Sequence, residues 1–402
     1  MSVTRPSSRR DGQRFQAPKK PVTKFVYYRR RAITALGLIT VLYVGYLGIT
    51  LAQALTNPSY GVSMSARGAE WGREHGLGGV VTWVETEWYN LNPPKKGGKP
   101  SPNSFGSGPS YVNVPASGHL PAPVRIISPA SPALPGEGVW HVEGRRSAKG
   151  IPGVYEAFVR PDAVHTSFVV GVAWMDPSVL KARLYSGSFI PGGGPFKYSA
   201  PISAIASRTL VASFNAGFRM QDANGGYYTD GKIANGLRLR SGAASLVIYK
   251  NGKMTVGQWG RDFHMTSDVV SVRQNLDLIV DKSKPVAGLD SRDTKKWGVT
   301  LGGAAYVWRS GMGVTANGAL VYVGGPSLSI TGLADVLVRA GAVRAMELDI
   351  NTDWVQYSTF AGPLGTSING GDGTRLLSTM IGPPSRYFAS WWNRDFITMS
   401  LR

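Results

Sequence analysis

The chain has 402 residues, enough for one large domain with appendages, and its 43% of hydrophobic residues exclude a chain that is disordered throughout. Lys and Arg outnumber Asp and Glu by 44 to 24, which gives a net charge of +20. Cysteine is absent, which excludes disulfides, thiolate metal sites and a cysteine nucleophile.

Residues 1–31 form a basic segment. They hold ten Lys and Arg and one acid, Asp11, so they carry +9 of the total charge of +20. A basic arm can bind nucleic acid, but an apolar run follows this one directly. We therefore interpret residues 1–31 as a cytoplasmic tail that contacts anionic lipid, and expect no nucleic-acid partner.

Residues 32–55 contain no charged side chain. As a helix, this run would rise about 36 Å at about 1.5 Å per residue, enough to cross a hydrocarbon core of about 30 Å. It predicts one transmembrane helix, with the N-terminus in the cytoplasm and residues 56–402 outside, in a single-pass protein of the cell membrane. Ala52-Gln53-Ala54 also fits a signal-peptidase site, so a cleaved signal peptide is the alternative to a signal-anchor.

Two segments separate this helix from the main domain. Residues 56–90 are predicted to be a membrane-proximal segment, with a short amphipathic helix, a glycine break and a second helix or strand. Residues 91–138 hold 11 of the 26 prolines together with many Gly and Ser, which predicts a linker that does not order itself and serves as a stalk.

From Val139 the pattern changes to short apolar runs separated by Gly, Asn and Asp. Asn251-Gly252 and Asn317-Gly318 lie between strand-like runs and predict hairpin turns. Residues 331–341 have helical apolar spacing and end in glycine, and a strand is predicted over 343–350. Residues 139–402 are therefore predicted to form a β-rich mixed α+β domain with few helices.

The strand over 343–350 carries two acids, Glu347 and Asp349. Side chains at i and i+2 share one face of a strand, so these carboxylates are expected about 6–7 Å apart. Such a pair suits general acid and base catalysis, because each charge raises the pKa of the other. The alternative is a solvated strand end without a catalytic role.

Asp349, Asn351 and Asp353 alternate as they do at the start of a calcium-binding loop. Trp354 occupies the place where that loop needs Gly, so the EF-hand pattern is not met. A looser site for a divalent cation such as calcium remains open.

Two other strand ends carry polar residues. Residues 212–219 place Asn215, Gly217 and Arg219 at the end of a predicted strand. Arg309 ends another strand, shortly before Gly313. Arginine can hold a phosphate with two parallel hydrogen bonds, although Arg309 could equally be a surface residue by its spacing alone.

The order of these pieces resembles the phosphodiester glycosidase family over about residues 205–360. Asn215 and Gly217 match the first motif of the family, Arg309 and Gly313 its arginine motif, and Asp349 the aspartate of its last motif. The chain departs from that last motif, because Glu347 replaces an asparagine and Ile350-Asn351-Thr352-Asp353 replaces three glycines and a serine. These replacements are expected to reshape the floor of the pocket.

The resemblance implies a membrane-anchored extracytoplasmic hydrolase that cleaves a sugar from a phosphodiester-linked glycan or envelope polymer. Asp349 and Glu347 would share the acid, base or nucleophile roles, and Arg309 would hold the phosphate and stabilise the departing charge. The substrate-binding residues would be Asn215, Gly217, Arg219, Gly313 and Asn351. The alternative is a non-catalytic envelope protein of the same fold that binds an anionic cell-wall polymer.

Overall fold

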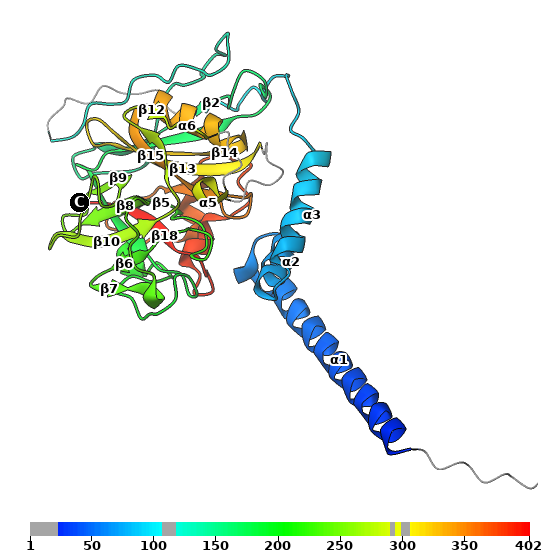
Figure 1. The fold of residues 1–402 in the computed structure, drawn as a ribbon. Helices are drawn as coiled ribbons and strands as arrows, with labels where there is room; N and C mark the ends of the chain where they lie inside the picture. Colours follow the sequence, from blue (N-terminus) through cyan, green and yellow to red (C-terminus); the bar gives the residue numbers. More distant parts are fainter. Residues whose placement is uncertain (1–22, 107–117, 290–293, 299–305) are drawn as a thin grey trace, which may run out of the picture. The chain divides into compact units, whose positions relative to one another are not determined.

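The computed structural model describes residues 23–106, 118–289, 294–298 and 306–402. The chain divides into two units, Met1–Gln53 and Ala54–Arg402 (Figure 1). All the sheets and the cavity described below belong to the second unit.

Helix α1 (Lys24–Thr56) begins eight residues before the apolar run identified in the sequence. Its apolar window has a mean hydropathy of 2.0, and none of that window is buried within the protein. By length and composition α1 could cross a membrane, and a signal sequence near the N-terminus would have the same properties. Residues 1–22 of the predicted basic tail lie outside the described residues.

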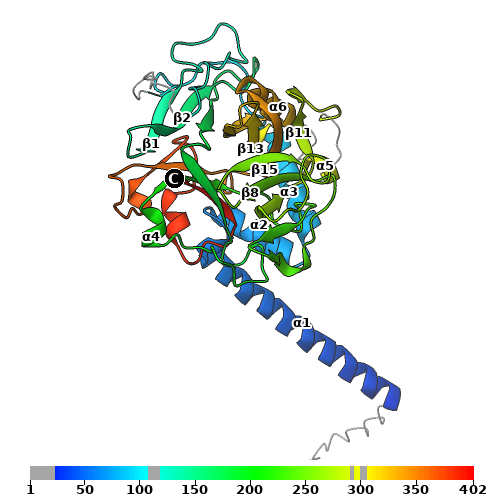
Figure 2. The same cartoon turned by 90° about the vertical axis from the view of Figure 1, so that its left-hand side faces the viewer.

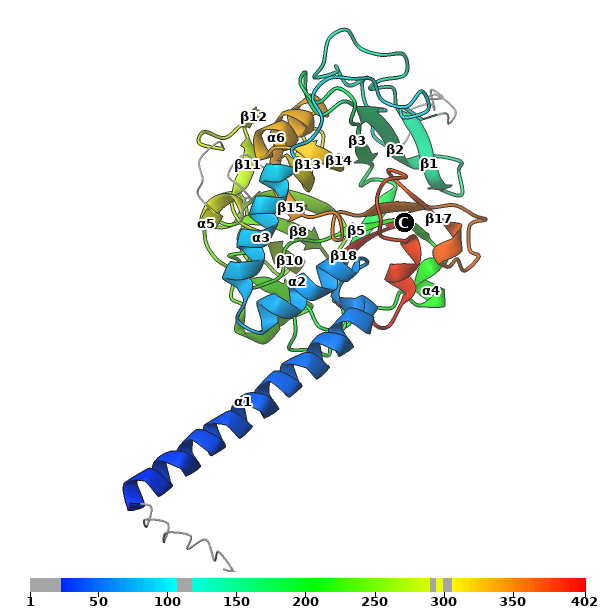
Figure 3. The ribbon, with the colours of Figure 1, turned by 90° about the vertical axis from the view of Figure 1, so that its right-hand side faces the viewer.

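The segment after α1 forms a 3₁₀ turn, η1 (Pro58–Tyr60), and two helices, α2 (Met64–Glu74) and α3 (Gly78–Leu91), which contact each other (Figure 3). Helix α2 starts where it does because the Ser63 hydroxyl accepts a hydrogen bond from the Ala66 amide at 3.1 Å. Helix α3 starts at Gly78, inside the predicted glycine break.

The described parts of the predicted linker pack against the domain. Phe105 and Ile126 are 6% and 1% exposed, and the Ile126 amide donates to the Gly138 carbonyl at 3.0 Å. The carboxylate of Glu137 is fully buried and accepts a hydrogen bond from Arg160 Nη2 at 2.9 Å. The expectation that this segment cannot order itself is wrong for residues 118–138, because a buried ion pair and a few apolar anchors fix it. Residues 107–117 lie outside the described residues.

The domain contains one large antiparallel sheet, with β1 and β11 toward opposite ends (Figure 2). Its eight strands are, in spatial order, β1 (His141–Arg146), β2 (Pro152–Val159), β3 (Val170–Met175), β14 (Leu320–Leu328), β13 (Val307–Thr315), β15 (Ala342–Ile350), β11 (Leu278–Asp281) and β12 (Lys284–Pro285).

Two five-stranded antiparallel sheets complete the domain. One has the order β7 (Lys232–Ile233), β6 (Tyr227–Thr229), β10 (Val269–Gln274), β8 (Ala244–Tyr249) and β9 (Met254–Gln258). The other has the order β17 (Gly373–Arg375), β16 (Tyr357–Phe360), β5 (Leu210–Asn215), β18 (Phe396–Leu401) and β4 (Leu180–Tyr185). The short helical turns are α4 (Ala204–Ser207), η2 (Ala234–Gly236), α5 (Thr294–Trp297), η4 (Gly370–Asp372) and η5 (Pro384–Phe388).

The principal core joins the three sheets, and helix α6 (Ile330–Arg339) contacts β13, β14 and β15 of the large sheet. Leu333, Val336 and Leu337 of α6 are fully buried, as the helical spacing predicted. Hairpin turns join β8 to β9 and β13 to β14 at the two predicted Asn-Gly pairs. The β-rich α+β fold predicted from the sequence is confirmed.

A buried ion pair connects two sheets near the ends of their strands. Arg273 Nε on β10 donates to Asp395 Oδ2, just before β18, at 2.7 Å, and both side chains are 0% exposed. The same guanidinium donates to the carbonyls of Gln274 and Phe218. Arg273 therefore fixes the turn after β5 and the start of β18, and both segments contribute to the cavity described next.

We expect Asp395→Asn to lower the free energy of unfolding by about 3–5 kcal/mol, because it leaves a buried arginine charge without its counter-ion. The control is Asp281→Asn, which removes one partner of the Arg261–Asp281 pair, whose side chains are 44% and 23% exposed. That change should cost about 0–1 kcal/mol. Urea unfolding of both variants measures the difference, and equal effects would contradict the structural role assigned to Arg273.

Candidate functional site

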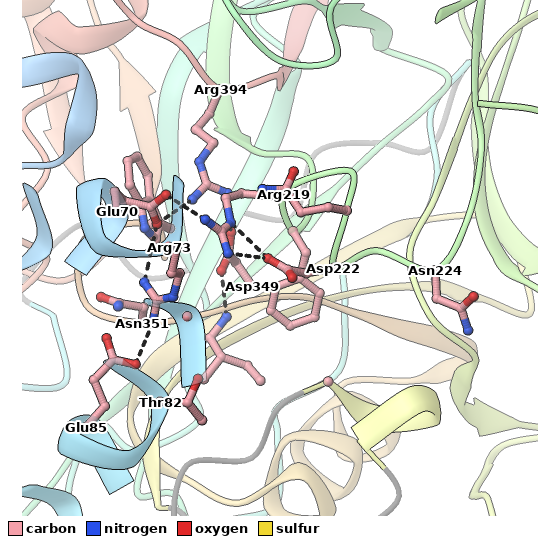
Figure 4. A pocket seen from close by; sticks show the side chains of 16 residues that line it. Glu70, Arg73, Thr82, Glu85, Arg219, Asp222, Asn224, Asp349, Asn351 and Arg394 are labelled. Carbon is pink, nitrogen blue, oxygen red and sulfur yellow. Dashed lines mark hydrogen bonds and ion pairs between the residues drawn. The ribbon is translucent and has the colours of Figure 1, made fainter. Parts of the chain in front are cut away.

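A cavity of about 810 Å³ lies where β15 ends (Figure 4). Its lining comes from the end of β15 and the residues that follow, the turn after β5, helices α2 and α3, Gly298 after α5, and Arg394 just before β18. Its volume is in the range typical of small-molecule sites. The charged side chains that line it are Glu70, Arg73, Glu85, Arg219, Asp222, Asp349 and Arg394.

Asp349 reaches this cavity because β15 is irregular. Glu347 pairs with Gly311 and Asp349 pairs with Ser310, so one extra residue of β15 is inserted between two adjacent residues of β13. A bulge of this kind breaks the regular alternation of side chains along a strand. As a consequence Asp349 lines the cavity and Glu347 does not.

The carboxyl group of Asp349 has few partners for its charge. Its Oδ1 accepts a hydrogen bond from the Ile350 amide at 2.8 Å, and its Oδ2 lies 3.9 Å from Arg394 Nη1. Burial raises the pKa of Asp349 from 3.8 to about 7, although Arg394 and the Ile350 amide act in the opposite direction. Asp349 can therefore hold or release a proton near neutral pH.

Glu70 of α2 brings two arginines of the domain together. Its Oε2 accepts from Arg219 Nη1 at 3.0 Å, and its Oε1 accepts from Arg394 Nη2 at 3.3 Å. Arg73 Nη1 lies 3.6 Å from the same carboxylate. Glu70 is buried, with 7% of the residue exposed, so an anionic group already occupies the space between these guanidinium groups.

The two arginines differ in how their charges are balanced. Burial alone would lower the pKa of Arg219, but Glu70 and Asp222 raise it above its usual value. Burial lowers the pKa of Arg394, which Glu70 and Asp349 only partly offset. The guanidinium of Arg394 also lies 4.0 Å from the ring centre of Trp354, a cation–π contact that fixes its position.

Arg309 and Glu347, both predicted as catalytic, form a buried pair outside the cavity lining. Arg309 Nη1 donates to Glu347 Oε1 at 2.5 Å, and Arg309 Nε donates to the Leu328 carbonyl at 3.0 Å. Their side chains are 0% and 1% exposed. Burial raises the pKa of Glu347 to about 7 despite the attraction of Arg309.

Asn215 is likewise not part of the cavity lining. Its Nδ2 donates to the Ser310 hydroxyl at 3.0 Å, and its Oδ1 accepts from the Tyr322 hydroxyl at 3.0 Å and the Gln356 amide at 3.2 Å. Ser310 is the residue opposite Asp349 on β13. Asn215 therefore helps to position β13 opposite Asp349 of β15.

Gly217 and Gly313, both predicted to bind substrate, lie where neighbouring atoms pack too closely for a side chain. A Cβ atom at Gly217 would lie 3.0 Å from Arg273 Cζ. A Cβ atom at Gly313 would lie 2.7 Å from the Cβ of Ala342 on the neighbouring strand. The space at both positions is needed for the protein's own atoms, and neither glycine lines the cavity.

Asn351 lines the cavity in an unusual backbone conformation, with φ at 137°. This region is normally occupied by glycine, and a side chain there indicates local strain. The Asn351 Oδ1 accepts from the Asp353 amide at 2.9 Å, and its own amide donates to the Trp308 carbonyl at 3.0 Å. Asn351 thus keeps a glycine-like backbone at the position where the family motif has glycine.

The side-chain oxygens of Asp349, Asn351 and Asp353, considered as metal ligands, accept hydrogen bonds from different backbone amides. Asp353 Oδ1 accepts from the Val62 and Ser63 amides at 2.8 and 3.0 Å, so this side chain anchors the segment that leads into α2. Within residues 23–106, 118–289, 294–298 and 306–402, no group of three or more His, Cys, Asp or Glu side chains is arranged to hold a metal ion.

Of the predicted residues, the structure brings Asp349, Arg219 and Asn351 together in the cavity. Sequence reasoning did not identify Glu70, Arg73 and Arg394. Arg394 follows two tryptophans near the end of the chain, and Glu70 belongs to a helix outside the predicted domain. No local pattern marks either residue, because both join the site only through tertiary packing.

The model of the phosphodiester glycosidase family matches residues 208–349. This stretch runs from just before β5 to Asp349, and the match confirms the resemblance to that family seen in the sequence. No curated protein matches the chain.

Solved structures show distant likeness. The catalytic domain of zebrafish N-acetylglucosamine-1-phosphodiester alpha-N-acetylglucosaminidase, auto-inhibited by its pro-peptide, is 13% identical with a TM-score of 0.41, over 65% of this chain and 88% of that one. A hypothetical protein from Synechocystis is 13% identical with a TM-score of 0.32, over 62% of each chain. A putative exported protein from Burkholderia pseudomallei is 14% identical with a TM-score of 0.30, over 58% of this chain and 74% of that one. At these scores the likeness supports no inference about the site.

The burial of Asp349 predicts a pH-dependent effect on stability. Between its ordinary pKa of 3.8 and its folded pKa of about 7, the folded state holds a proton that the unfolded state has lost. The free energy of unfolding therefore falls as pH rises through this window. Asp349→Asn, which stays neutral, should match the parent chain near about pH 4 and exceed its stability near about pH 8.

Urea unfolding at both pH values measures this effect. Asp335→Asn is the control, because Asp335 is an exposed helix residue paired with Arg339. Parallel pH profiles for the parent chain and Asp349→Asn would contradict the raised pKa of Asp349.

Proposed function

We propose that this chain is a membrane-anchored extracytoplasmic hydrolase that cleaves a sugar from a phosphodiester-linked glycan. The observation that carries the proposal is a buried carboxyl group, Asp349, with a pKa of about 7, beside two arginines whose guanidinium groups already hold an anion. The match of residues 208–349 to the phosphodiester glycosidase family supports the reaction class.

Arg219 and Arg394 suit the phosphate of such a substrate. Two guanidinium groups that converge on the carboxylate of Glu70 have the donors and the charge to bind a phosphate oxygen in the same place. They would also stabilise the negative charge that develops on the departing phosphate. The phosphate would have to displace Glu70 or bind beside it, because Glu70 is a fixed part of the lining.

Asp349 would act at the sugar carbon. As a carboxylate it can take a proton from a water molecule that attacks the anomeric carbon, or attack that carbon itself to form a glycosyl ester that water then hydrolyses. The bond between the anomeric carbon and the phosphate oxygen then breaks, and the electron pair leaves with the phosphomonoester. Because a phosphate leaves readily, this scheme needs little help from a second acid, and one carboxyl group in the cavity is sufficient.

Glu347 and Arg309 would have a positioning role in this proposal. They lie on the two strands that meet at the bulge, and their buried ion pair crosses between those strands. Asn215 would act in the same way through Ser310. None of these three residues needs to touch the substrate.

Helix α1, together with Arg29, Arg30 and Arg31 just before its apolar run, supports the cellular arrangement in this proposal. By the positive-inside rule these charges would keep the N-terminus in the cytoplasm, and residues 56–402 would lie outside. The substrate would then be an envelope glycan or polymer that contains sugar phosphodiesters.

We expect Asp349→Asn to reduce sugar release by about 10²- to 10⁴-fold, the usual contribution of a positioned proton-transfer group. Purified full-length protein in detergent is assayed on a panel of sugar 1-phosphodiesters, with free sugar as the readout. The control is Asp222→Asn in the same cavity. The Asp222 side chain is 42% exposed, so this change should reduce sugar release by less than about tenfold. Binding without sugar release by the parent chain would contradict the enzyme and favour a binding role.

Glu70→Gln should lower the KM for the cleaved diester by about tenfold, equal to about 1.4 kcal/mol, because Arg219 and Arg394 lose the anion that neutralises them. Glu74→Gln is the control on the same helix, since Glu74 accepts a hydrogen bond from the Tyr60 hydroxyl and does not line the cavity. An unchanged or higher KM for Glu70→Gln would show that Glu70 does not compete with the phosphate.

A further inference from the structure

A second, smaller cavity of about 170 Å³ shares no lining residue with the one described above. It lies between β4, the edge strand of one five-stranded sheet, and the β8–β9 hairpin of the other. Its charged lining residues are Lys181, Arg183, Lys197, Asp230 and Lys250. Four positive charges therefore face one negative charge.

The fold places the segments that carry these cations, and backbone hydrogen bonds hold those segments together. On β4, Lys181 and Arg183 alternate with the buried residues Leu180, Ala182 and Leu184, so both point to the side away from the core. The Ala182 amide donates to the Gly252 carbonyl at 2.8 Å, which holds the β8–β9 turn against β4. The Ser186 amide donates to the Tyr198 carbonyl at 3.0 Å, which holds the segment that carries Lys197.

In the part of the chain that the structure describes, the cations of this pocket form no ion pairs. Among the described residues, no carboxylate lies within ion-pair distance of Lys181, Arg183, Lys197 or Lys250. Arg183 and Lys197 both approach the ring of Tyr198, at 4.7 and 5.4 Å from its centre. Burial, followed by the like charges of Arg183 and Arg402, lowers the pKa of Lys181. The lining of the pocket therefore carries four positive charges against the one negative charge of Asp230.

We propose that this pocket is a second anion site that binds a phosphate or phosphodiester group. Several cations that line one pocket without ion-pair partners among the described residues suit a compact anion with several acceptor oxygens, and Arg183 can donate two parallel hydrogen bonds. A carboxylate offers fewer acceptors to the same four donors. The site does not depend on the hydrolytic function proposed for the main cavity.

The test uses the absence of cysteine in the chain. Asn251→Cys, labelled with an environment-sensitive fluorophore, reports on this pocket, and Thr82→Cys reports on the main cavity. Each labelled full-length protein is titrated in detergent with inorganic tripolyphosphate, orthophosphate and a short glycerol phosphate oligomer. Because the readout is binding, a failure here is distinct from a failure to find turnover.

We expect a saturable signal at position 251 that weakens about tenfold in Lys197→Gln/Lys250→Gln, as the loss of two phosphate contacts implies. The matched control is Lys282→Gln/Lys284→Gln, which removes two exposed lysines of another hairpin and should leave affinity unchanged. Binding of orthophosphate would indicate a single phosphate ligand, and binding of the oligomer alone a polymer; both support the site. No saturable signal, or equal weakening in the two double variants, would overturn it.

Discussion

The site depends on keeping Asp349 out of water while two arginines remain charged beside it. Burial of the carboxyl group raises its pKa, and the charge of Arg394 limits that rise, so the group titrates near neutral pH. Neither effect alone would produce a proton-transfer group that works at that pH, because an exposed aspartic acid ionises far below it. The geometry around Asp349 therefore determines what the cavity can do.

Three separate parts of the chain maintain this geometry. The bulge between β13 and β15 directs Asp349 into the cavity, and the Arg273–Asp395 pair fixes the segments that carry Arg219 and Arg394. Helix α2 supplies Glu70, which holds the two arginines at their present positions. Because α2 is itself anchored by Asp353, four residues after Asp349, the segment after α1 is an integral part of the site.

Much of the fold could be predicted from the sequence. The Asn-Gly turns, the amphipathic helix before β15 and the β-rich domain follow from local patterns, and the structure has them. The ordered part of the predicted linker could not be foreseen, since Glu137 and Ile126 gain their partners only through tertiary contacts. A proline-rich composition indicates how the segment behaves in isolation, but it does not predict the contacts that the segment makes with the folded domain.

The site was predictable only where local sequence and packing agree. Asp349, Arg219 and Asn351 line the cavity, whereas Glu347, which regular alternation would place beside Asp349, is turned away by an insertion of one residue in the strand pairing. A bulge depends on the partner strand and leaves no mark in a single sequence. Glu70 and Arg394 are 324 residues apart and meet only in the folded chain.

The central claim is that the bond between the anomeric carbon and the phosphate oxygen breaks, with Asp349 acting at that carbon, so that the reaction is glycoside hydrolysis. Turnover in water enriched in oxygen-18, followed by mass spectrometry of both products, tests this directly. The account predicts the heavy oxygen in the released sugar and ordinary oxygen in the phosphate product. Heavy oxygen in the phosphate product would mean attack at phosphorus and would contradict the account.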